Sequence, residues 1–192
     1  MSVALYNKAY HFTHVDNLRM IARHGLLSHT NVNAGGIARR DISDHEVQQK
    51  RARPEPVYAR PIHDYVPMYL NPRNPMLYKL RRLADQLVML AIDISDFLPV
   101  PVLFTDGNAA CRATCFGRGL DTVIPSDEIL RSEYWSGFDE GTRRRCAEFL
   151  VPDRIPVSLI SSVYARNGRV KTIADDLFPT RCVVEPDLYF RK

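Results

Sequence analysis

The apolar segment at residues 86–94 (QLVMLAIDI) constrains the fold more than any other part of the chain. It contains the longest apolar run, from Leu87 to Ile92, which has the length of a strand buried on both faces. A run of this length is far too short to cross a bilayer. We therefore expect a core of short strands around one central buried strand, and we expect no membrane partner.

Short strands mixed with short helices, without a regular alternation of the two, predict the α+β class. We expect strands at residues 9–13, 66–71, 86–94, 102–105, 147–151, 159–165 and 182–184. We expect helices at residues 16–24, 44–51, 75–83, 127–135, 140–146 and 170–177, with Ser43 or Asp44 capping the second and Gly25 ending the first. The remaining long segments, 28–40, 53–61 and 112–125, are expected to be loops. With 192 residues and neither repeat nor linker, residues 1–192 are predicted to form a single domain.

The arginines are distributed more informatively than the net charge of +4 suggests. Six basic residues fall between Arg39 and Arg60, in a stretch poor in apolar residues, and Arg143 to Arg145 form a second cluster. Such clusters are usually solvated surface. Two of them in one small domain nevertheless favour a partner that carries phosphate groups.

The N-terminal residues and the cysteines indicate which cellular compartment to expect for the chain. The first residues, MSVALYNKAYHF, lack a basic segment followed by a long apolar run, so we predict no secretory signal and a cytoplasmic location. The four cysteines are then expected to be reduced thiols. Cys111 and Cys115 have the spacing of half a zinc site, but no second pair lies at a suitable distance, and no metal is predicted.

Two segments in the first half of the chain are candidates for binding a nucleotide. At residues 10–18 (YHFTHVDNL) an expected strand ends where a helix begins, and His11 and Thr13 lie on one side of that strand. These groups suit a ribose or a carboxamide, although a capping turn with a buried histidine explains them equally well. Arg51, at the end of an expected helix, is placed to reach a pyrophosphate or a nucleic-acid backbone, or else it only complements the helix dipole.

Two later segments are also unusual. Residues 63–77 (HDYVPMYLNPRNPML) are dense in proline, tyrosine and arginine, and Tyr69 is a candidate for stacking on a nicotinamide or a base. The alternative is a surface corner with aromatic packing. Glu148 begins an apolar strand, so its carboxylate is expected either to border a cleft or to face solvent.

These segments together resemble the DarT family of DNA ADP-ribosyltransferases. The resemblance covers most of the chain and is carried, in order, by HFTHVDNLRMIARHGLL, VQQKRAR, HDYVPMYLNPRNPMLY, LFTDGNAA and AEFLV. The third block is the most specific. Residues 53–61 contain less glycine than the family pattern, and residues 112–125 match no part of it. These loops are expected to shape the groove for nucleic acid, so the preference for a base and a sequence is the least transferable feature.

The resemblance implies an ADP-ribosyltransferase-like split core of mixed and antiparallel β structure with short peripheral helices. It implies NAD+ as co-substrate, single-stranded DNA as the other substrate, and a DarG-like macrodomain antitoxin as partner. Glu148 and Arg51 are then the catalytic residues. The residues expected to bind NAD+ are His11, Phe12, Thr13, Asn17, Met20, Tyr69 and Arg51. Those expected to contact nucleic acid are Lys50, Arg53, His63, Tyr65, Arg73 and Arg145.

The expected reaction transfers ADP-ribose to a base, thymidine in most relatives and guanosine in one branch. Arginine stays protonated in proteins, so we expect Arg51 to bind the pyrophosphate or to stabilise a deprotonated thymine, and not to act as a free base. Three alternatives remain open at this point. The acceptor is RNA or protein; the chain is a non-enzymatic nucleic-acid-binding module; or, ranked lowest, it is a zinc-binding protein.

Overall fold

Strand β4 (Leu87–Asp93) is the centre of the computed structural model, which describes residues 6–191. Residues Leu87 to Ile92 are fully buried, as the apolar run predicts. β4 pairs in antiparallel fashion with all seven residues of β1 (Lys8–His14) on one side and with β9 (Ser162–Ala165) on the other. A strand covered on both edges and both faces provides the rigid base on which the rest of the sheet is built.

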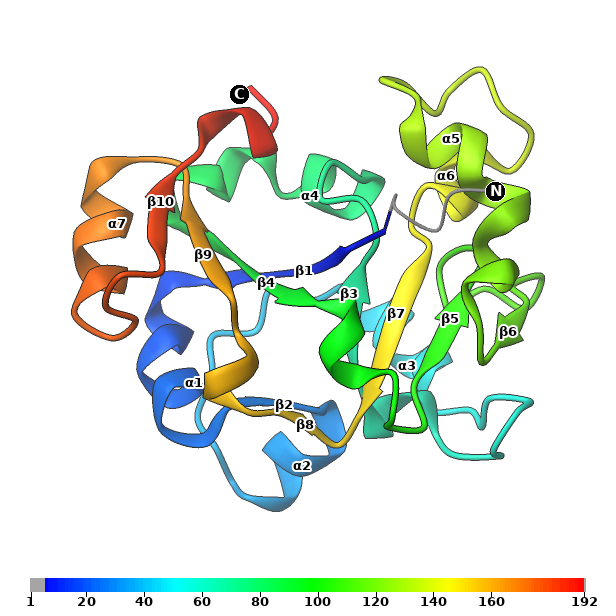
Figure 1. The fold of residues 1–192 in the computed structure, drawn as a ribbon, viewed down its shortest axis with the longest axis horizontal. Coiled ribbons are helices and arrows are strands. Elements are labelled where there is room, and N and C mark those ends of the chain that lie inside the picture. Colours follow the sequence, from blue (N-terminus) through cyan, green and yellow to red (C-terminus); the bar gives the residue numbers. More distant parts are fainter. Residues whose placement is uncertain (1–5, 192) are drawn as a thin grey trace.

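The main sheet of the described residues has eight strands in the order β10-β9-β4-β1-β3-β7-β5-β6 (Figure 1). All neighbouring pairs are antiparallel except β9 and β10, which are parallel. The predicted α+β class with a mixed sheet is therefore confirmed. The remaining strands of this sheet are β3 (Tyr65–Tyr69), β5 (Leu103–Thr105), β6 (Phe116–Gly117), β7 (Glu148–Pro152) and β10 (Cys182–Val184), and a small second sheet pairs β2 (Leu26–Leu27) with β8 (Arg154–Ile155).

The sheet splits between β1 and β3. These strands share a single register pair, Tyr10 with Tyr69, whereas β3 and β7 share five. Pro67 accounts for the missing β1–β3 pairs. Pro67 is two residues before Tyr69, so its backbone groups face the same neighbour, β1, and proline has no N–H to donate there. Its carbonyl oxygen accepts a hydrogen bond from the side chain of His11 in place of a ladder bond (3.0 Å).

Short helices surround the sheet. Figure 1 shows α7 beside β9 and β10 at one end, and α5 and α6 near β5 at the other. Asp44 caps α3 by accepting hydrogen bonds from two backbone amides, as predicted. The helices are α1 (Leu18–His24), α2 (His29–Ala34), α3 (His45–Arg51), α4 (Pro75–Lys79), α5 (Asp127–Arg131), α6 (Gly141–Arg144) and α7 (Gly168–Asp175), and the short 3-10 turns are Val15–Asn17, Ile62–Asp64, Arg81–Gln86, Ile94–Phe97, Leu120–Ser126, Val157–Leu159 and Pro186–Leu188.

Three of the expected loops and strands differ from the structure. Helix α2 lies inside residues 28–40, because the Ser28 hydroxyl accepts a hydrogen bond from the amide of Asn31 and so begins a helix that its polar composition concealed. Residues 112–125 contain β6 and most of a 3-10 turn. The strand expected from residue 159 begins only at Ser162, since a 3-10 turn precedes it.

The proline-rich segment 53–61 contains neither helix nor named strand, as predicted, but it is not simply an exposed loop. The carboxylate of Glu55 is buried and accepts hydrogen bonds from the amides of Val57, Tyr58 and Arg60. The segment is therefore folded around one carboxylate.

No helix among residues 6–191 has the length and apolarity needed to cross a membrane. The prediction about a secretory signal rests partly on residues 1–5, which lie outside the described part.

Candidate active site

Arg51 and Glu148 form a buried ion pair where α3 ends against β7. Nη2 of Arg51 lies 2.5 and 2.6 Å from the two carboxylate oxygens of Glu148. Glu148 has no exposed surface and Arg51 is 6% exposed. Burial alone would lower the pKa of Arg51, but the adjacent carboxylate outweighs it and the pKa is raised. The sequence predicted both residues as partners in chemistry, and the structure brings them into contact.

Further hydrogen bonds to Glu148 come from Thr105, on β5, and from the hairpin loop of residues 106–115 between β5 and β6. The backbone amide of Ala109 donates to Oε1 of Glu148 (2.9 Å). The amide of Glu148 donates to the hydroxyl of Thr105 (2.9 Å), and that hydroxyl donates to the carbonyl of Gly107 (2.6 Å). The carboxylate is thus fixed from its own backbone and from the loop that faces it.

His11 lies at the split between β1 and β3 as a neutral acceptor. Burial lowers its pKa, and the charge of Arg51 lowers it further, whereas the hydrogen bond to Pro67 acts in the opposite direction. Because Nδ1 lies 3.0 Å from the Pro67 carbonyl oxygen, Nδ1 must carry the proton. Nε2 is then free to accept a hydrogen bond, as a ribose hydroxyl requires.

Tyr69 stacks on Phe12 and is the cross-strand neighbour of Glu148. The rings of Phe12 and Tyr69 are almost parallel, at 6°, with centroids 5.4 Å apart. Tyr69 pairs with Glu148 in the β3–β7 register. Burial raises the pKa of Tyr69 well above its usual value, and the charge of Glu148 raises it further, so the phenol stays neutral. The pair forms an aromatic surface beside the carboxylate.

Asn17 fixes the segment 37–44 across the cavity from β1. Its Nδ2 donates to the hydroxyl of Thr13 and to the carbonyl of Arg40, each at 2.9 Å, and its Oδ1 accepts from the amide of Arg40 (2.7 Å). The polar groups of Asn17 are therefore already engaged. It shapes the cavity by holding the segment that covers it.

Two cavities meet near the ion pair. The first cavity lies between β1, α3 and the segment 37–44, and the second lies between α3, α4, α6 and the hairpin loop; Val47, Met76 and Asn108 line both. Of the residues predicted to bind NAD+, the first cavity is lined by His11, Phe12, Thr13, Asn17, Met20, Tyr69 and Arg51. The structure thus gathers the whole predicted set at one site.

The residues predicted to contact nucleic acid are not gathered in this way. Lys50 and Arg53 line the second cavity, and Arg53 also donates to the carbonyls of Ala109 and Cys111. His63 lines the first cavity, where its ring stacks on His29 with centroids 4.3 Å apart. Arg73 is exposed, with its guanidinium over the ring of Phe190.

Two of those residues are buried. Arg145 is 3% exposed, and its guanidinium donates to four backbone carbonyls, those of Arg73, Ile129, Leu130 and Ser132. Tyr65 is 1% exposed, and its hydroxyl donates to Glu55 (3.0 Å). Nε and Nη1 of Arg145 and the hydroxyl of Tyr65 are engaged inside the protein. A cationic or aromatic residue type does not reveal which way its side chain points.

Sequence reasoning missed the roles of Thr105, Asn108 and Ala109. Thr105 and Ala109 contact Glu148, and the rim residue Asn108 lines both cavities. The block LFTDGNAA contributed to the resemblance, but Ala109 acts through its backbone, which carries no sequence signal. Within residues 6–191, no three His, Cys, Asp or Glu side chains group closely enough to hold a metal ion.

Comparison with known proteins decides the family. A family model described as "ssDNA thymidine ADP-ribosyltransferase, DarT" matches residues 10–190. The chain belongs to the DarT family. A DNA ADP-ribosyl transferase of Thermus sp. (strain 2.9) is 34% identical over 176 residues, which are 84% of this chain and 82% of that relative. A transferase–glycohydrolase fusion protein of Thermosipho africanus is 29% identical over 170 residues, and this DarT chain spans only 44% of its length.

Solved DarT structures share the fold. The Thermus sp. 2.9 DarT in complex with ADP-ribosylated ssDNA has a TM-score of 0.85 at 29% identity, with 96% of this chain and 97% of that chain covered. The same protein in complex with NAD+ has a TM-score of 0.82 at 28% identity, with coverage of 98% and 100%. The resemblance inferred from five sequence blocks is confirmed at the level of family and fold.

Proposed function

We propose that this DarT chain transfers ADP-ribose from NAD+ to the thymine base of single-stranded DNA and releases nicotinamide. The observation that carries the proposal is the buried Arg51–Glu148 pair at the side of a cavity lined by His11 and Tyr69. The relatives described as DNA ADP-ribosyl transferases, and the complexes with NAD+ and ADP-ribosylated DNA, support it.

NAD+ binds in the first cavity, between β1 and the segment 37–44. Nε2 of His11 accepts a hydrogen bond from a ribose hydroxyl, and the stacked rings of Phe12 and Tyr69 provide an apolar face for the nicotinamide. Arg39 and Arg40 also line this cavity and supply positive charge for the pyrophosphate. No metal is needed to hold the phosphates in this arrangement.

Glu148 acts where the bond between nicotinamide and ribose breaks. The bond electrons leave with nicotinamide, and positive charge develops on the ribose carbon. A preorganised carboxylate next to that carbon stabilises the charge more than water can. Because Arg51 covers both carboxylate oxygens, it must first shift toward the pyrophosphate of NAD+ and exchange one anionic partner for another.

The acceptor base approaches from the second cavity. Lys50 and Arg53 line it and suit the phosphates of a strand, while Asn108 lies where the two cavities meet. The imide N–H of thymine is paired in duplex DNA, so a single-stranded or extruded base is required. The imide nitrogen of thymine attacks the ribose carbon, and the proton of that nitrogen leaves to solvent.

A macrodomain antitoxin is the proposed partner, and the proposed place of both is the cytoplasm. The Thermosipho africanus relative joins a DNA ADP-ribosyl transferase to a DNA ADP-ribosyl glycohydrolase in one chain. An enzyme that removes the modification is the counterpart expected of a toxin that adds it.

The proposal is tested with labelled NAD+ and short single-stranded oligonucleotides that each lack one base. We expect a mass gain that disappears only when thymine is absent. A gain that instead needs guanine moves the acceptor to guanosine. Labelling of RNA or protein alone would identify another acceptor, and binding of DNA without binding of NAD+ would leave a non-enzymatic module.

A further inference from the structure

The turn that carries the Ala109 amide to Glu148 is long. It spans residues 106–115 between β5 and β6, which pair only at Phe104 with Gly117 and Thr105 with Phe116. The loop is longer than the common hairpin turns of two to five residues. Hydrogen bonds within it, from the Cys111 amide and the Thr114 hydroxyl to the carbonyl of Asn108, fold part of it. Contacts from outside the loop fix this partly folded segment against the rest of the protein, and so fix where the amide of Ala109 points.

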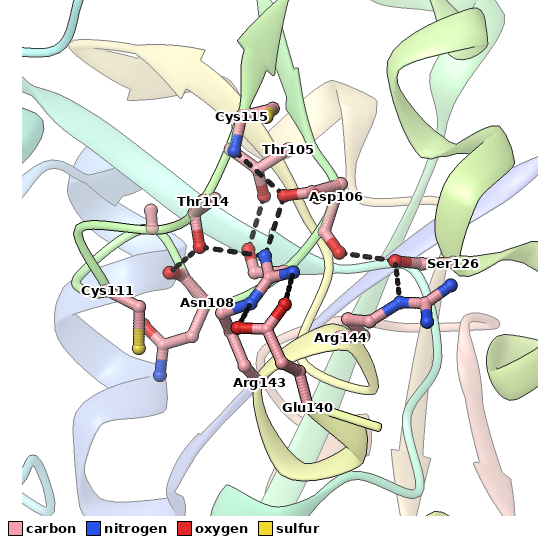
Figure 2. Close-up of polar contacts among 12 residues, drawn as sticks. Thr105, Asp106, Asn108, Cys111, Thr114, Cys115, Ser126, Glu140, Arg143 and Arg144 are labelled. Carbon is pink, nitrogen blue, oxygen red and sulfur yellow. Dashed lines mark hydrogen bonds and ion pairs between the residues drawn. The ribbon is translucent and has the colours of Figure 1, made fainter. Parts of the chain in front are cut away.

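Arg143, on α6, supplies one set of these contacts. Its Nη1 donates to Oδ1 of Asp106 (2.9 Å), at the start of the loop, and also approaches the hydroxyl of Thr114 (3.4 Å), near its end. Its Nε and Nη2 donate to the two carboxylate oxygens of Glu140 at 3.0 and 2.8 Å. Figure 2 shows the guanidinium between the two acidic side chains, so its orientation is determined from both sides.

The backbone around Arg143 and Asp106 extends the network. The carbonyl of Arg143 accepts a hydrogen bond from the amide of Asn108 (2.9 Å), the residue before Ala109. Oδ1 of Asp106 accepts from the amide of Cys115 (2.9 Å), which closes the loop. A Cβ on Gly107 would lie 2.7 Å from Nη1 of Arg143, so the loop packs directly on the guanidinium.

We propose that the Arg143–Asp106 pair is a positioning element that directs the Ala109 amide at Glu148. The pair lies close to the reacting carboxylate in the chain, because α6 leads directly into β7. Both side chains are largely buried, with 11% and 8% of their surfaces exposed. The proposal rests on the function proposed above, since it concerns how Glu148 is presented.

The consequence for catalysis follows from the partners of Glu148. Among the described residues, its carboxylate oxygens contact Arg51 and the Ala109 amide. When Arg51 shifts to NAD+, Ala109 remains and holds Oε1, so Oε2 faces the ribose in a defined orientation. If the loop moved, the carboxylate would rotate away from the developing charge. The loss would appear in turnover and not in the binding of NAD+.

The test compares Arg143→Met, Arg143→Lys and the matched control Arg166→Met. Arg166 forms an ion pair of similar length with Asp85 (2.8 Å) and is 20% exposed, but it follows β9 at the far end of the sheet. For each protein we would measure NAD+ hydrolysis without DNA, transfer to a thymine oligonucleotide, NAD+ affinity and the melting temperature. Hydrolysis without DNA reports on Glu148 alone, because a change in the DNA groove cannot affect it.

For Arg143→Met we expect kcat to fall about tenfold to a hundredfold in both reactions, with NAD+ affinity within about twofold of the parent. Arg143→Lys, which keeps the charge beside Asp106, should recover part of the loss, and Arg166→Met should lose none. Unchanged hydrolysis in Arg143→Met would overturn the proposal, as would an equal loss in Arg166→Met. If Arg143→Met does not fold, Asp106→Ala replaces it, because it removes the carboxylate that Nη1 of Arg143 contacts.

Glu148→Gln is measured in the same series to separate the two proposals. If Glu148→Gln is fully active, the function proposed for that residue fails whatever Arg143 does. If Glu148→Gln is inactive and Arg143→Met, or Asp106→Ala in its place, keeps the parent kcat, only the positioning role fails.

Discussion

Arg51 and Glu148 are 97 residues apart in the sequence, yet one guanidinium nitrogen contacts both carboxylate oxygens at 2.5 and 2.6 Å. Their side chains are 7% and 0% exposed. In so buried a pair, each charge compensates the desolvation of the other, and removing one partner leaves an unpaired charge in the interior. The pair therefore links the stability of the fold to the chemistry proposed for it.

Glu148→Gln should abolish transfer and lower the free energy of unfolding by about 3 kcal/mol, because Arg51 keeps its charge and loses its partner. The double variant Arg51→Met with Glu148→Gln should recover much of that stability without activity. Urea denaturation measures the first quantity and oligonucleotide labelling the second. A single variant as stable as the parent would show that the pair does not form in solution.

The binding of NAD+ should resist mild acid and then weaken, because the pKa of His11 is lowered from its ordinary value of 6.5 and only the neutral ring offers Nε2 as an acceptor. The folded chain binds fewer protons there than the unfolded chain. The stability contribution is thus complete above pH 6.5 and is lost as the pH falls through the lowered pKa. Melting temperatures and NAD+ affinities from pH 7.5 to about 5 check this. His11→Asn should flatten both profiles relative to the parent, although His29 and His63, whose pKa values burial also lowers, will leave some residual slope.

Tyr69→Ala should raise the KM for NAD+ about tenfold, since it removes a stacked ring beside the reacting carboxylate. Tyr69→Phe keeps the ring and should stay close to the parent. Steady-state kinetics on NAD+ hydrolysis measures both. Equal KM values for Tyr69→Ala and the parent would place the nicotinamide elsewhere.

Arg145→Met should destabilise the fold by about 3 kcal/mol, because four backbone carbonyls lose a buried donor. The salt dependence of its DNA binding should match that of the parent. Lys50→Ala should show the opposite pattern, with normal stability and a shallower dependence of DNA affinity on salt, because Lys50 is exposed beside the second cavity. Chemical denaturation and salt titrations distinguish the two residues, and a reversed outcome would restore Arg145 to the DNA surface.

Patterns that depend on burial were predictable from the sequence. The run from Leu87 to Ile92 has enough apolar surface to define the central strand, and Asp44 is a strong cap at the start of α3. The ordered blocks of the family resemblance indicated His11, Arg51 and Glu148, which lie at one site. Such features are local or carried by residue type, so a single sequence contains them.

Features that depend on the direction in which a side chain points, or on contacts of the backbone, were not predictable from the sequence. Helix α2 (HTNVNA) is mostly polar and depends on the Ser28 cap and on a hydrogen bond from Asn31 to the carbonyl of Asp153, far away in the sequence. Arg145 belongs to an arginine cluster, but only the fold shows that it points inward. The Ala109 amide is invisible to any argument from side chains, and so is its dependence on Arg143.

The site depends on a hydrogen-bond donor that Pro67 lacks. The opening between β1 and β3 exists because one backbone position has no hydrogen to offer, and the carbonyl left over orients the ring of His11. Any other residue at this position would restore a backbone donor on the edge facing β1. Grafting this nucleotide site onto another sheet would therefore require a proline on the edge strand as well as the catalytic side chains.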